Sequence, residues 1–343
     1  MLDLSVVVPV YNMAKDGNLD YCMNSLVRQT LQSMEIVAVD DASTDDSLKI
    51  LQEFEKRYPG RVRVVASPEN RKQGGARNLG LREAQGRYIG FMDADDWVVE
   101  DLYERMVEVA KCTGADVVGT DMCRVYEHTM IPTQREECNL PSQTGIFDHE
   151  KRKEYLLHPG PLVTKIYARE IFFDKEFRFP EQISYEDNAT FLEIGMRMKH
   201  FEHISEANVF YYQHGDSTVH TFSETRCNDR LEAGRIMMKE AKRLGFLEEF
   251  QKEIEYKFTL LFYINTLFTY MPCVRPVKVS YVKAMTEEML QTWPAFRENP
   301  YYMERTAAEE KKLIDMACDS ALKFVIYYKL LWGYRKLRKK LRK

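Results

Sequence analysis

The first third of the chain alternates short apolar runs with segments of helical spacing, and this alternation limits the fold more than any other feature. The runs 4–8 and 35–39 are rich in valine and isoleucine, as in strands that are covered on both faces. A helical pattern follows the first run over residues 19–29, and another begins after Ser43. Such alternation predicts a mostly parallel α/β sheet flanked by helices.

The same pattern continues and then changes character. Further strands are expected at 62–65, 88–92 and 116–120, and further helices at 73–83 and 100–111. Residues 130–145 are expected to form a polar loop, and helical or strand-like pieces resume over 151–157, 163–167, 188–198 and 209–212. From about residue 227 every long segment has helical spacing. We therefore expect an α/β domain over residues 1–215 and a helical region over 216–343.

The distribution of charge excludes one class of partner for most of the chain. The net charge is −4, but the last ten of the 343 residues hold seven bases and no acid. The remainder carries 42 bases (49 minus 7) against 53 acids, a net charge of −11. A region with this negative net charge is not expected to bind nucleic acid.

Cysteine use and hydropathy indicate the compartment. The seven cysteines are odd in number, scattered, and never in a Cys-x-x-Cys pair, which favours thiols in a reducing compartment over disulfides or a zinc site. No basic flank or signal-peptide apolar region precedes the first strand, and the uncharged stretch 258–274 is short for a membrane span. We expect a buried helix there and a cytoplasmic protein.

Polar residues follow three of the expected strands. Tyr11 and Asn12 follow the first, Asp40 and Asp41 end the second, and Asp93-Ala94-Asp95-Asp96 follows the fourth. Ligands of open α/β sheets bind beyond the carboxyl ends of the strands. Each group alone could be a helix cap or a turn, so their coincidence is the informative observation.

The spacing of Asp93 and Asp95 favours a metal site. Two residues apart in extended chain, both side chains lie on one face. Paired carboxylates at a strand end suit Mg²⁺ or Mn²⁺ bridging phosphates. The alternative is a surface turn, with Asp96 capping the next helix.

The chain has a glycine-rich helix start but neither of the common nucleotide loops. No Walker-type loop and no Gly-x-Gly-x-x-Gly after the first strand is present. Gly74-Gly75-Ala76-Arg77-Asn78-Leu79-Gly80 would allow close backbone approach, and Arg77 could face an anion. A plain entry from loop to helix is the alternative.

Together these segments resemble the nucleotide-sugar-binding half of family 2 glycosyltransferases, which have the GT-A fold. The resemblance rests on an ordered series that covers about residues 4–215 and leaves out the helical third. The series is Ser5-Val6-Val7-Val8-Pro9-Val10-Tyr11-Asn12, Val39-Asp40-Asp41-Ala42-Ser43-Thr44-Asp45, the glycine-rich segment, Phe91-Met92-Asp93-Ala94-Asp95-Asp96, Lys165-Ile166-Tyr167 and Tyr185-Glu186-Asp187-Asn188-Ala189-Thr190-Phe191. The last two segments resemble the acceptor half of bacterial polysaccharide-type members.

The resemblance implies roles for individual residues on the donor side. Pro9, Tyr11 and Asp41 would line the base and ribose, with Asp41 accepting from a uracil N–H. Asp40 would be a supporting residue, and Arg77 would lie near the nucleotide or its phosphates. Asp93 would approach the ribose or the metal, and Asp95 would be the direct ligand of Mn²⁺ or Mg²⁺.

An inverting glycosyl transfer needs a base for the acceptor hydroxyl, and Asp187 is the candidate. It opens a helix whose N-terminus would stabilise its ionised form. Glu186 would support it or bind acceptor; the alternative is an acidic pair that only caps the helix. Lys165 could contact phosphate or acceptor and His214 the diphosphate or metal, although both could equally be solvated surface residues.

The C-terminal end is expected to form an amphipathic helix. Leu330, Tyr334, Leu337 and Leu341 fall on one stripe, and the seven bases cover the other sides. This pattern suits an interfacial helix on anionic lipid at the inner face of the cell membrane. A solvated helix end or a subunit contact, including a homodimer, is the alternative.

The sequence thus predicts a metal-dependent, inverting transferase. It would move a sugar from a nucleotide-diphosphate donor, a UDP-sugar, to a saccharide or lipid-linked saccharide in surface polysaccharide synthesis. A sugar-nucleotide pyrophosphorylase is a second hypothesis, but the loop Tyr11-Asn12-Met13-Ala14 lacks the glycines and arginine that class requires. A catalytically inactive nucleotide-sugar-binding protein is a third.

Overall fold

The computed structural model describes residues 2–131, 134–173, 177–213 and 223–341. The chain forms two compact units, residues 1–217 and 218–343, which are described separately below. The division lies two residues beyond the boundary expected from the sequence.

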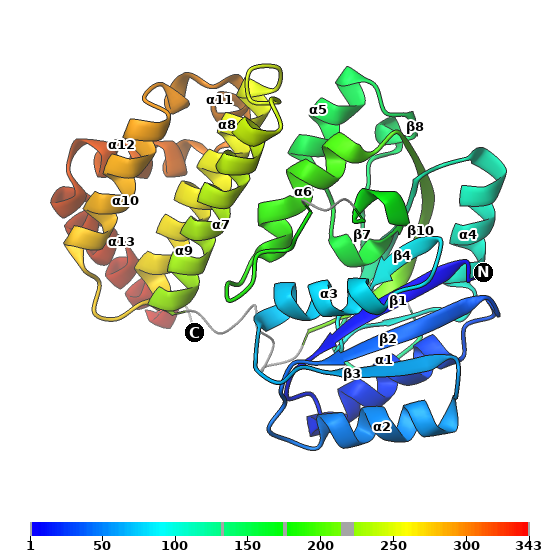
Figure 1. Ribbon diagram of the computed structural model, residues 1–343. Coiled ribbons are helices and arrows are strands. Elements are labelled where there is room, and N and C mark those ends of the chain that lie inside the picture. Colours follow the sequence, from blue (N-terminus) through cyan, green and yellow to red (C-terminus); the bar gives the residue numbers. More distant parts are fainter. Residues whose placement is uncertain (1, 132–133, 174–176, 214–222, 342–343) are drawn as a thin grey trace. The chain divides into compact units, whose positions relative to one another are not determined.

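The first unit is built on one twisted sheet (Figure 1). Within the described residues the sheet has ten strands, in the order β3-β2-β1-β4-β9-β6-β10-β5, with β7 paired to β6 and β8 to β10. Their bounds are β1 (Leu4–Val10), β2 (Met34–Asp40), β3 (Val62–Ala66), β4 (Tyr88–Phe91), β5 (Trp97–Val98), β6 (Val117–Val125), β7 (Gln134–Glu136), β8 (Gly145–Ile146), β9 (Lys165–Ala168) and β10 (His200–Tyr212).

The direction of the strands changes halfway across the sheet. Strands β3, β2, β1 and β4 run parallel, as the alternating pattern predicts. Strand β9 then runs antiparallel to both of its neighbours, β4 and β6, while β10 is parallel to β6. The sheet is therefore mixed, with its parallel half at the N-terminal end of the chain.

Helices cover both faces of the parallel half (Figure 1). Helices α1 (Asn18–Val27), α2 (Ser47–Arg57) and α4 (Leu102–Thr113) share one hydrophobic cluster with inward side chains of β1 and β2. Helix α3 (Lys72–Glu83) packs on the opposite face, where Gly80 lies against Val7 and Val39. Helices α5 (His149–Leu157) and α6 (Glu186–Arg197) pack against each other, and α6 also contacts α3.

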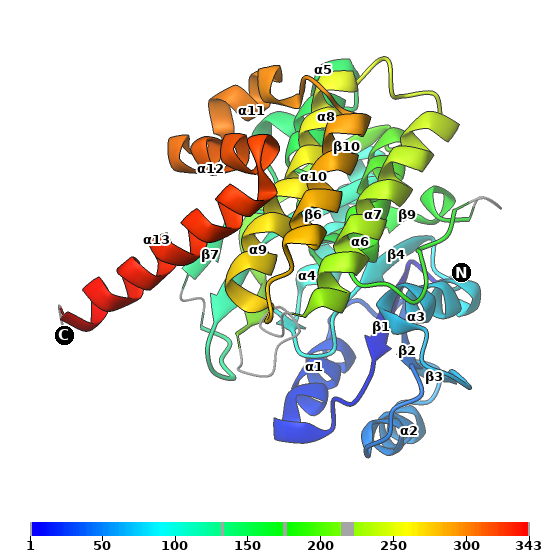
Figure 2. The same cartoon turned by 90° about the vertical axis from the view of Figure 1, so that its left-hand side faces the viewer.

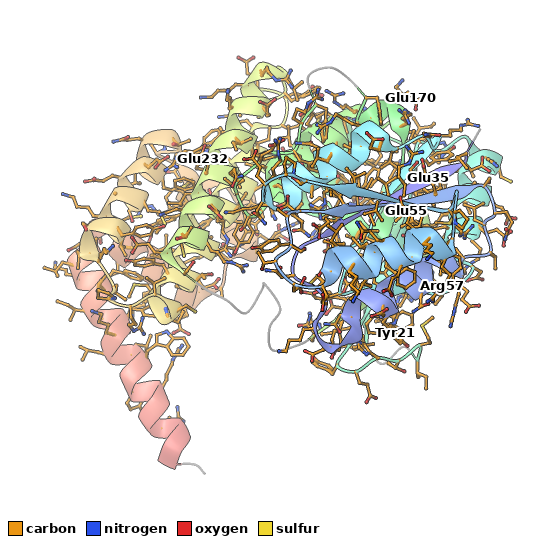
Figure 3. The ribbon with its side chains drawn as sticks, turned by 60° about the horizontal axis from the view of Figure 1, so that its bottom comes forward. Tyr21, Glu35, Glu55, Arg57, Glu170 and Glu232 are labelled. Carbon is orange, nitrogen blue, oxygen red and sulfur yellow. The ribbon has the colours of Figure 1, made fainter. Side chains whose placement is uncertain are left out.

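A buried carboxylate fixes the turn between α3 and β4. Glu35 of β2, labelled in Figure 3, accepts hydrogen bonds from the Ser5 hydroxyl at 2.6 Å and from the Gln85 N–H at 2.7 Å. The turn that precedes β4 is thus tied to two neighbouring strands, which fixes where β4 and its terminal carboxylates begin.

The second unit is helical in its described residues, as expected. A π-helical turn at Thr259–Ile264 joins α8 to α9, and the stretch 258–274 is largely buried, as the sequence predicts. None of the described helices combines the length and the apolar composition that crossing a bilayer requires. The helices are α7 (Glu224–Arg243), α8 (Gln251–Phe258), α9 (Asn265–Cys273), α10 (Val279–Thr292), α11 (Pro300–Arg305), α12 (Ala308–Asp319) and α13 (Ala321–Leu341).

Helix α13 extends past the other helices of its unit (Figures 2 and 3). Near its start Phe324, Val325 and Tyr328 are buried against the unit. A second apolar stripe of the same helix is exposed: Leu322 is 55% exposed and Leu330 is 69% exposed. The helix therefore has one apolar face that packs and another that faces solvent.

Candidate active site

The carboxyl ends of β1, β2 and β4 lie side by side because these strands are parallel neighbours. Val10 is paired with Asp40, and Val7 with Phe91. The polar residues that follow each strand therefore meet at one edge of the sheet, which is where ligands of open α/β folds bind.

Two of the expected nucleotide-binding residues lie on β1 and directly after it. Pro9 is inside the strand and buried, whereas Tyr11 is 47% exposed at the rim of the edge. An exposed aromatic ring at this position is available for stacking on a base.

Asp40 and Asp41 are both buried at the end of β2. Asp41 Oδ1 accepts the backbone N–H of Arg71 at 2.8 Å, and burial raises the pKa of Asp41 although that N–H opposes the shift. Asp40 Oδ2 accepts the N–H of Ser43 at 3.2 Å, but its Oδ1 is buried without a donor among the described residues. A buried acceptor without a donor is costly, so Asp40 Oδ1 is a candidate to receive a ligand N–H.

Asp93 is held by two donors from α3. Its Oδ1 accepts from Gln73 Nε2 at 2.7 Å and from Arg77 Nη2 at 3.2 Å. Burial raises the pKa of Asp93 to about 6; the charge of Arg77 opposes this shift, and the nearby charges of Asp95 and Asp187 add to it. The side chain still keeps 31% of its surface exposed, so part of the carboxylate faces the edge of the sheet.

Asp96 is a partner of the sheet rather than a cap of the next helix. Its Oδ1 accepts the backbone N–H of Tyr212 at 2.9 Å, which anchors the end of β10 beside the acidic turn. Burial, with the charges of Asp95 and Asp93, raises the pKa of Asp96 well above its ordinary value. Three carboxylates thus crowd one turn, and Asp95 is partly exposed there.

Glu186 and Asp187 open α6 after Tyr185, which has a left-handed backbone with φ of 67°. Asp187 is partly exposed, and its Oδ1 accepts the N–H of Asn188 at 2.7 Å and the Asn188 Nδ2 at 2.9 Å. Glu186 is buried and accepts from Arg77 Nη1. Burial raises the pKa of Glu186 to about 7, opposed by Arg77 and increased by the charge of Asp187.

The carboxylates of the strand ends and of α6 form one electrostatic cluster. The charge of Asp187 raises the pKa of Asp93, and the charge of Asp93 raises the pKa of Glu186. Arg77 binds both sides of the cluster, because it donates to Asp93 and to Glu186. The structure therefore brings Asp93, Asp95, Glu186 and Asp187 together from distant parts of the sequence.

A cavity of about 50 Å³ lies beside Asp187. Its walls are mainly aromatic and aliphatic, and Asp187 and Asn188 are its polar members. The full lining is Tyr155, Pro159, Gly160, Leu162, Tyr167, Asp187, Asn188, Phe191 and Ile194. An apolar pocket with a carboxylate on its lining suits a small part of a substrate.

The acidic turn fits a divalent cation that is shared with a substrate. No group of three or more His, Cys, Asp or Glu side chains able to hold a metal alone occurs in the part of the chain that the structure describes. Two carboxylates completed by phosphate oxygens are, however, a common set for Mg²⁺. Burial is the main cause of the raised pKa of Asp93, and the charges of Asp95 and Asp187 add to it; a cation would relieve that added repulsion.

Lys165 does not lie with this cluster. It is buried at the start of β9, its Nζ donates to the Pro161 carbonyl at 3.1 Å, and the titratable groups that interact with it are Cys138 and Asp121. Burial lowers the pKa of Lys165 to about 7. It is thus not the solvated lysine that the sequence left open, and its contact with phosphate or acceptor stays a prediction. His214 lies outside the described residues.

Replacing Lys165 by methionine is expected to change how stability depends on pH. The folded pKa of about 7 is below the unfolded value of 10.5, so wild-type stability should rise with pH through this window. Lys165→Met removes that rise. The free energy of unfolding of Lys165→Met, taken relative to that of wild type, should therefore fall by about 3 kcal/mol between pH 7 and pH 10.

Urea denaturation at both pH values measures this difference. Lys56→Met, at an exposed position of α2, supplies the matched control for loss of a lysine. A difference between Lys165→Met and wild type that stays constant with pH would show that Lys165 is solvated in the folded protein.

Gln73 and the bond from Asp96 to β10 were not expected from the sequence. Gln73 lies four residues before Arg77 on α3, so both side chains project from one face of that helix. This spacing of four residues is the sequence feature from which Gln73 could have been predicted. The bond from Asp96 to β10 had no comparable signal, because it joins residues far apart in the sequence.

Comparison with known sequences identifies relatives of the first unit. Residues 5–172 match the sequence profile of the family described as "Glycosyl transferase family 2". The chain is 32% identical over 196 residues to the uncharacterized glycosyltransferase EpsJ of Bacillus subtilis, a match of 55% of this chain and 54% of EpsJ. It is 26% identical to the uncharacterized glycosyltransferase YibD of Escherichia coli over 62% of each chain. The chain thus spans about half to three fifths of the length of these relatives.

Solved structures with a similar fold match almost the whole chain. S. aureus TarS 1–349 in complex with UDP has a TM-score of 0.68 at 19% identity, over 98% of this chain and 92% of that one. The mannosyltransferase PcManGT from Pyrobaculum calidifontis, in complex with GDP-Man and Mn²⁺, has a TM-score of 0.51 at 16% identity, over 96% and 87%. These likenesses confirm the expected fold, a GT-A-type sheet with a helical C-terminal region.

Proposed function

We propose that this chain, which belongs to family 2 of the glycosyltransferases, transfers a sugar from a UDP-sugar to a hydroxyl group of a saccharide or lipid-linked saccharide. One observation carries the proposal. The carboxylates that follow β4 share a cluster with Asp187 at the start of α6, so donor-binding groups and a candidate base lie on the same site.

The donor would bind along the edge formed by β1 and β2. Tyr11 would stack on the base, while Pro9 would line it. Asp41 and the unpartnered Oδ1 of Asp40 would accept N–H groups of the base. The complexes of TarS with UDP and with UDP-GlcNAc support uracil as the base and a nucleotide sugar as the donor.

Asp95 and Asp93 would hold a divalent cation, Mn²⁺ or Mg²⁺, together with the diphosphate of the donor. A bound cation stabilises the negative charge of the leaving diphosphate. Asp93 would take part in holding the cation while its Oδ1 accepts from Gln73 and Arg77. The Mn²⁺ in the PcManGT complex supports use of a divalent metal.

Asp187 would act as the general base of an inverting transfer. Its carboxylate takes the proton of the acceptor hydroxyl while the acceptor oxygen attacks the anomeric carbon from the side opposite the diphosphate. The bond from the anomeric carbon to the diphosphate oxygen breaks, and UDP leaves with the electron pair. The two N–H donors from Asn188 fix the direction of the Asp187 carboxylate.

A donor screen tests the proposed function. Purified protein is incubated with UDP-, GDP- and dTDP-sugars and Mn²⁺, and release of the nucleoside diphosphate is measured with and without simple saccharides. Release from one UDP-sugar supports the proposal. Release of a nucleoside triphosphate when pyrophosphate is added would instead indicate a pyrophosphorylase, and binding without turnover an inactive binding protein.

We extend the proposal to the place where transfer occurs, the inner face of the cell membrane during synthesis of a surface polysaccharide. The poly(ribitol-phosphate) beta-glucosyltransferase of Bacillus spizizenii, 35% identical to 34% of this chain over 18% of its own length, supports an acceptor of the polymer type. The exposed stripe of α13 and the bases that follow it would contact anionic lipid.

Removing the exposed stripe is expected to weaken binding to anionic vesicles. Truncation after Ser320 would also remove the buried Phe324, so Ile326→Ser with Leu330→Ser is the sharper change, since both residues are more than half exposed. We expect flotation with phosphatidylglycerol vesicles to fall about tenfold. Met303→Ser, which removes a comparably exposed apolar side chain from α11, is the control.

A result that contradicts membrane contact would be equal flotation of the double variant, the control and wild type. Conversion of a dimer to a monomer by the double variant, without any flotation of wild type, would assign the stripe to a contact between two copies of the chain.

A further inference from the structure

We infer that the start of α3 positions the Glu186–Asp187 pair, and that its glycine-rich segment docks protein rather than phosphate. Gly74, Arg77 and Asn78 of this helix, here called the α3 platform, contact the segment 179–187 that leads into α6. The inference rests on the proposed function, because it assigns a positioning role in the same reaction.

Asn78 fixes the beginning of the docked segment. Its Oδ1 accepts the N–H of Phe179 at 3.0 Å, and its Nδ2 donates to the carbonyl of the same residue at 2.8 Å. The Nδ2 also lies 3.1 Å from Glu181 Oε1. A buried amide that satisfies both backbone groups of one residue holds that residue in a single place.

Gly74 allows the segment to approach the helix. A Cβ atom at this position would lie 2.0 Å from the Pro180 carbonyl oxygen and 3.2 Å from Glu186 Cβ. Real Cβ contacts are not this short, so any side chain here would push the docked backbone away. The glycine is therefore required for contact with protein backbone, and this explains it without a bound phosphate.

Arg77 joins the docked segment to the donor side of the site. Its guanidinium is buried beside two aromatic rings, 5.8 Å from the ring centroid of Phe91 and 5.7 Å from that of Phe179. One Nη donates to Glu186 and the other to Asp93. The planar fork of an arginine can hold two carboxylates in a fixed relation, which a lysine cannot do.

The α3 platform thus sets where the base stands relative to the donor. Asp187 follows Glu186 directly, and Asp93 is one of the two carboxylates proposed to hold the metal. A shift of about 1 Å in such a relation can cost about 100-fold in rate. Arg77 is 3% exposed and each of its Nη atoms donates to a carboxylate of the protein, so we infer that it acts through Glu186 and Asp93 rather than on the diphosphate.

Gly74→Ala and Arg77→Lys test the inference, with Arg82→Lys, an exposed arginine of the same helix, as the matched control. Wild type must first show turnover with a UDP-sugar, which tests the proposed function separately. We then expect both variants to lose about 100-fold in kcat. Their affinity for UDP with Mn²⁺, measured by calorimetry, should stay within about threefold of wild type. The control should match wild type in both measurements.

Two outcomes would overturn the inference. One is a loss of UDP affinity by Arg77→Lys of tenfold or more, which would make Arg77 a nucleotide ligand as the family resemblance implies. The other is unchanged kcat in Gly74→Ala. Where Gly74→Ala does not fold, as judged by thermal melting, Asn78→Asp applies the same test, because it keeps the side-chain shape and removes the Nδ2 donor.

Discussion

Asp187→Asn is expected to lower kcat by about 1,000-fold while UDP still binds with wild-type affinity. The amide keeps an Oδ1 that can accept from Asn188, so the start of α6 should stay in place. It cannot take a proton from the acceptor hydroxyl, however, and the loss should therefore appear in turnover alone. Steady-state kinetics with the donor identified by the screen, and calorimetry with UDP and Mn²⁺, measure the two quantities.

Asp148→Asn is the matched control for this substitution. Asp148 is the N-cap of α5, where its side chain accepts the N–H of Lys151 at 2.9 Å, and it lies outside the acidic cluster. If Asp187 only caps α6, both variants should lose at most about 1 kcal/mol of stability and little activity. Retention of more than about a tenth of wild-type kcat in Asp187→Asn would place the base elsewhere.

Asp95→Ala is expected to abolish the metal dependence of donor binding. Two carboxylates at the acidic turn and the diphosphate would share the cation, so loss of one should weaken UDP binding about 100-fold in Mn²⁺. In the presence of a chelator the variant and wild type should bind UDP equally weakly. Calorimetry measures the four UDP affinities, those of wild type and of Asp95→Ala, each in Mn²⁺ and in chelator.

Asp101→Ala removes an exposed carboxylate near the same turn, at the N-cap of α4, and should leave the four values as in wild type. UDP binding by wild type that does not change on chelation would remove the cation from the donor site. In that case backbone N–H groups at this edge of the sheet would be the remaining candidates to neutralise the diphosphate.

The parallel half of the sheet could be predicted because its signals are local. Each of β1 and β2 is a continuous apolar run that is buried along its whole length, and each is followed by a helical pattern. Strand β9 gave no indication of its direction, since a short apolar run looks the same whichever way it pairs. In β10 only residues 209–212 were expected, because irregular register between residues 204 and 209 interrupts the alternation.

For the site, the residue types could be predicted but not all of their partners. The acids at the strand ends and at the start of α6 carry local signals of spacing and helix position. The burial of Arg77 depends on Phe91 and Phe179, and that of Lys165 on the segment around Pro161. These neighbours are set by tertiary contacts, so an arginine at a helix start and a lysine on a strand looked like ligands.

Strand β9 has a consequence for attempts to change what the protein acts upon. It hydrogen-bonds to β4, which delivers the donor-side acids, and to β6, which belongs to the later half of the unit. The two halves of the sheet are therefore joined through β9, and we expect them to unfold in one cooperative transition. Exchanging the whole later half between relatives would disrupt these strand pairings. Redesign of acceptor preference is therefore better directed at the loops around β9.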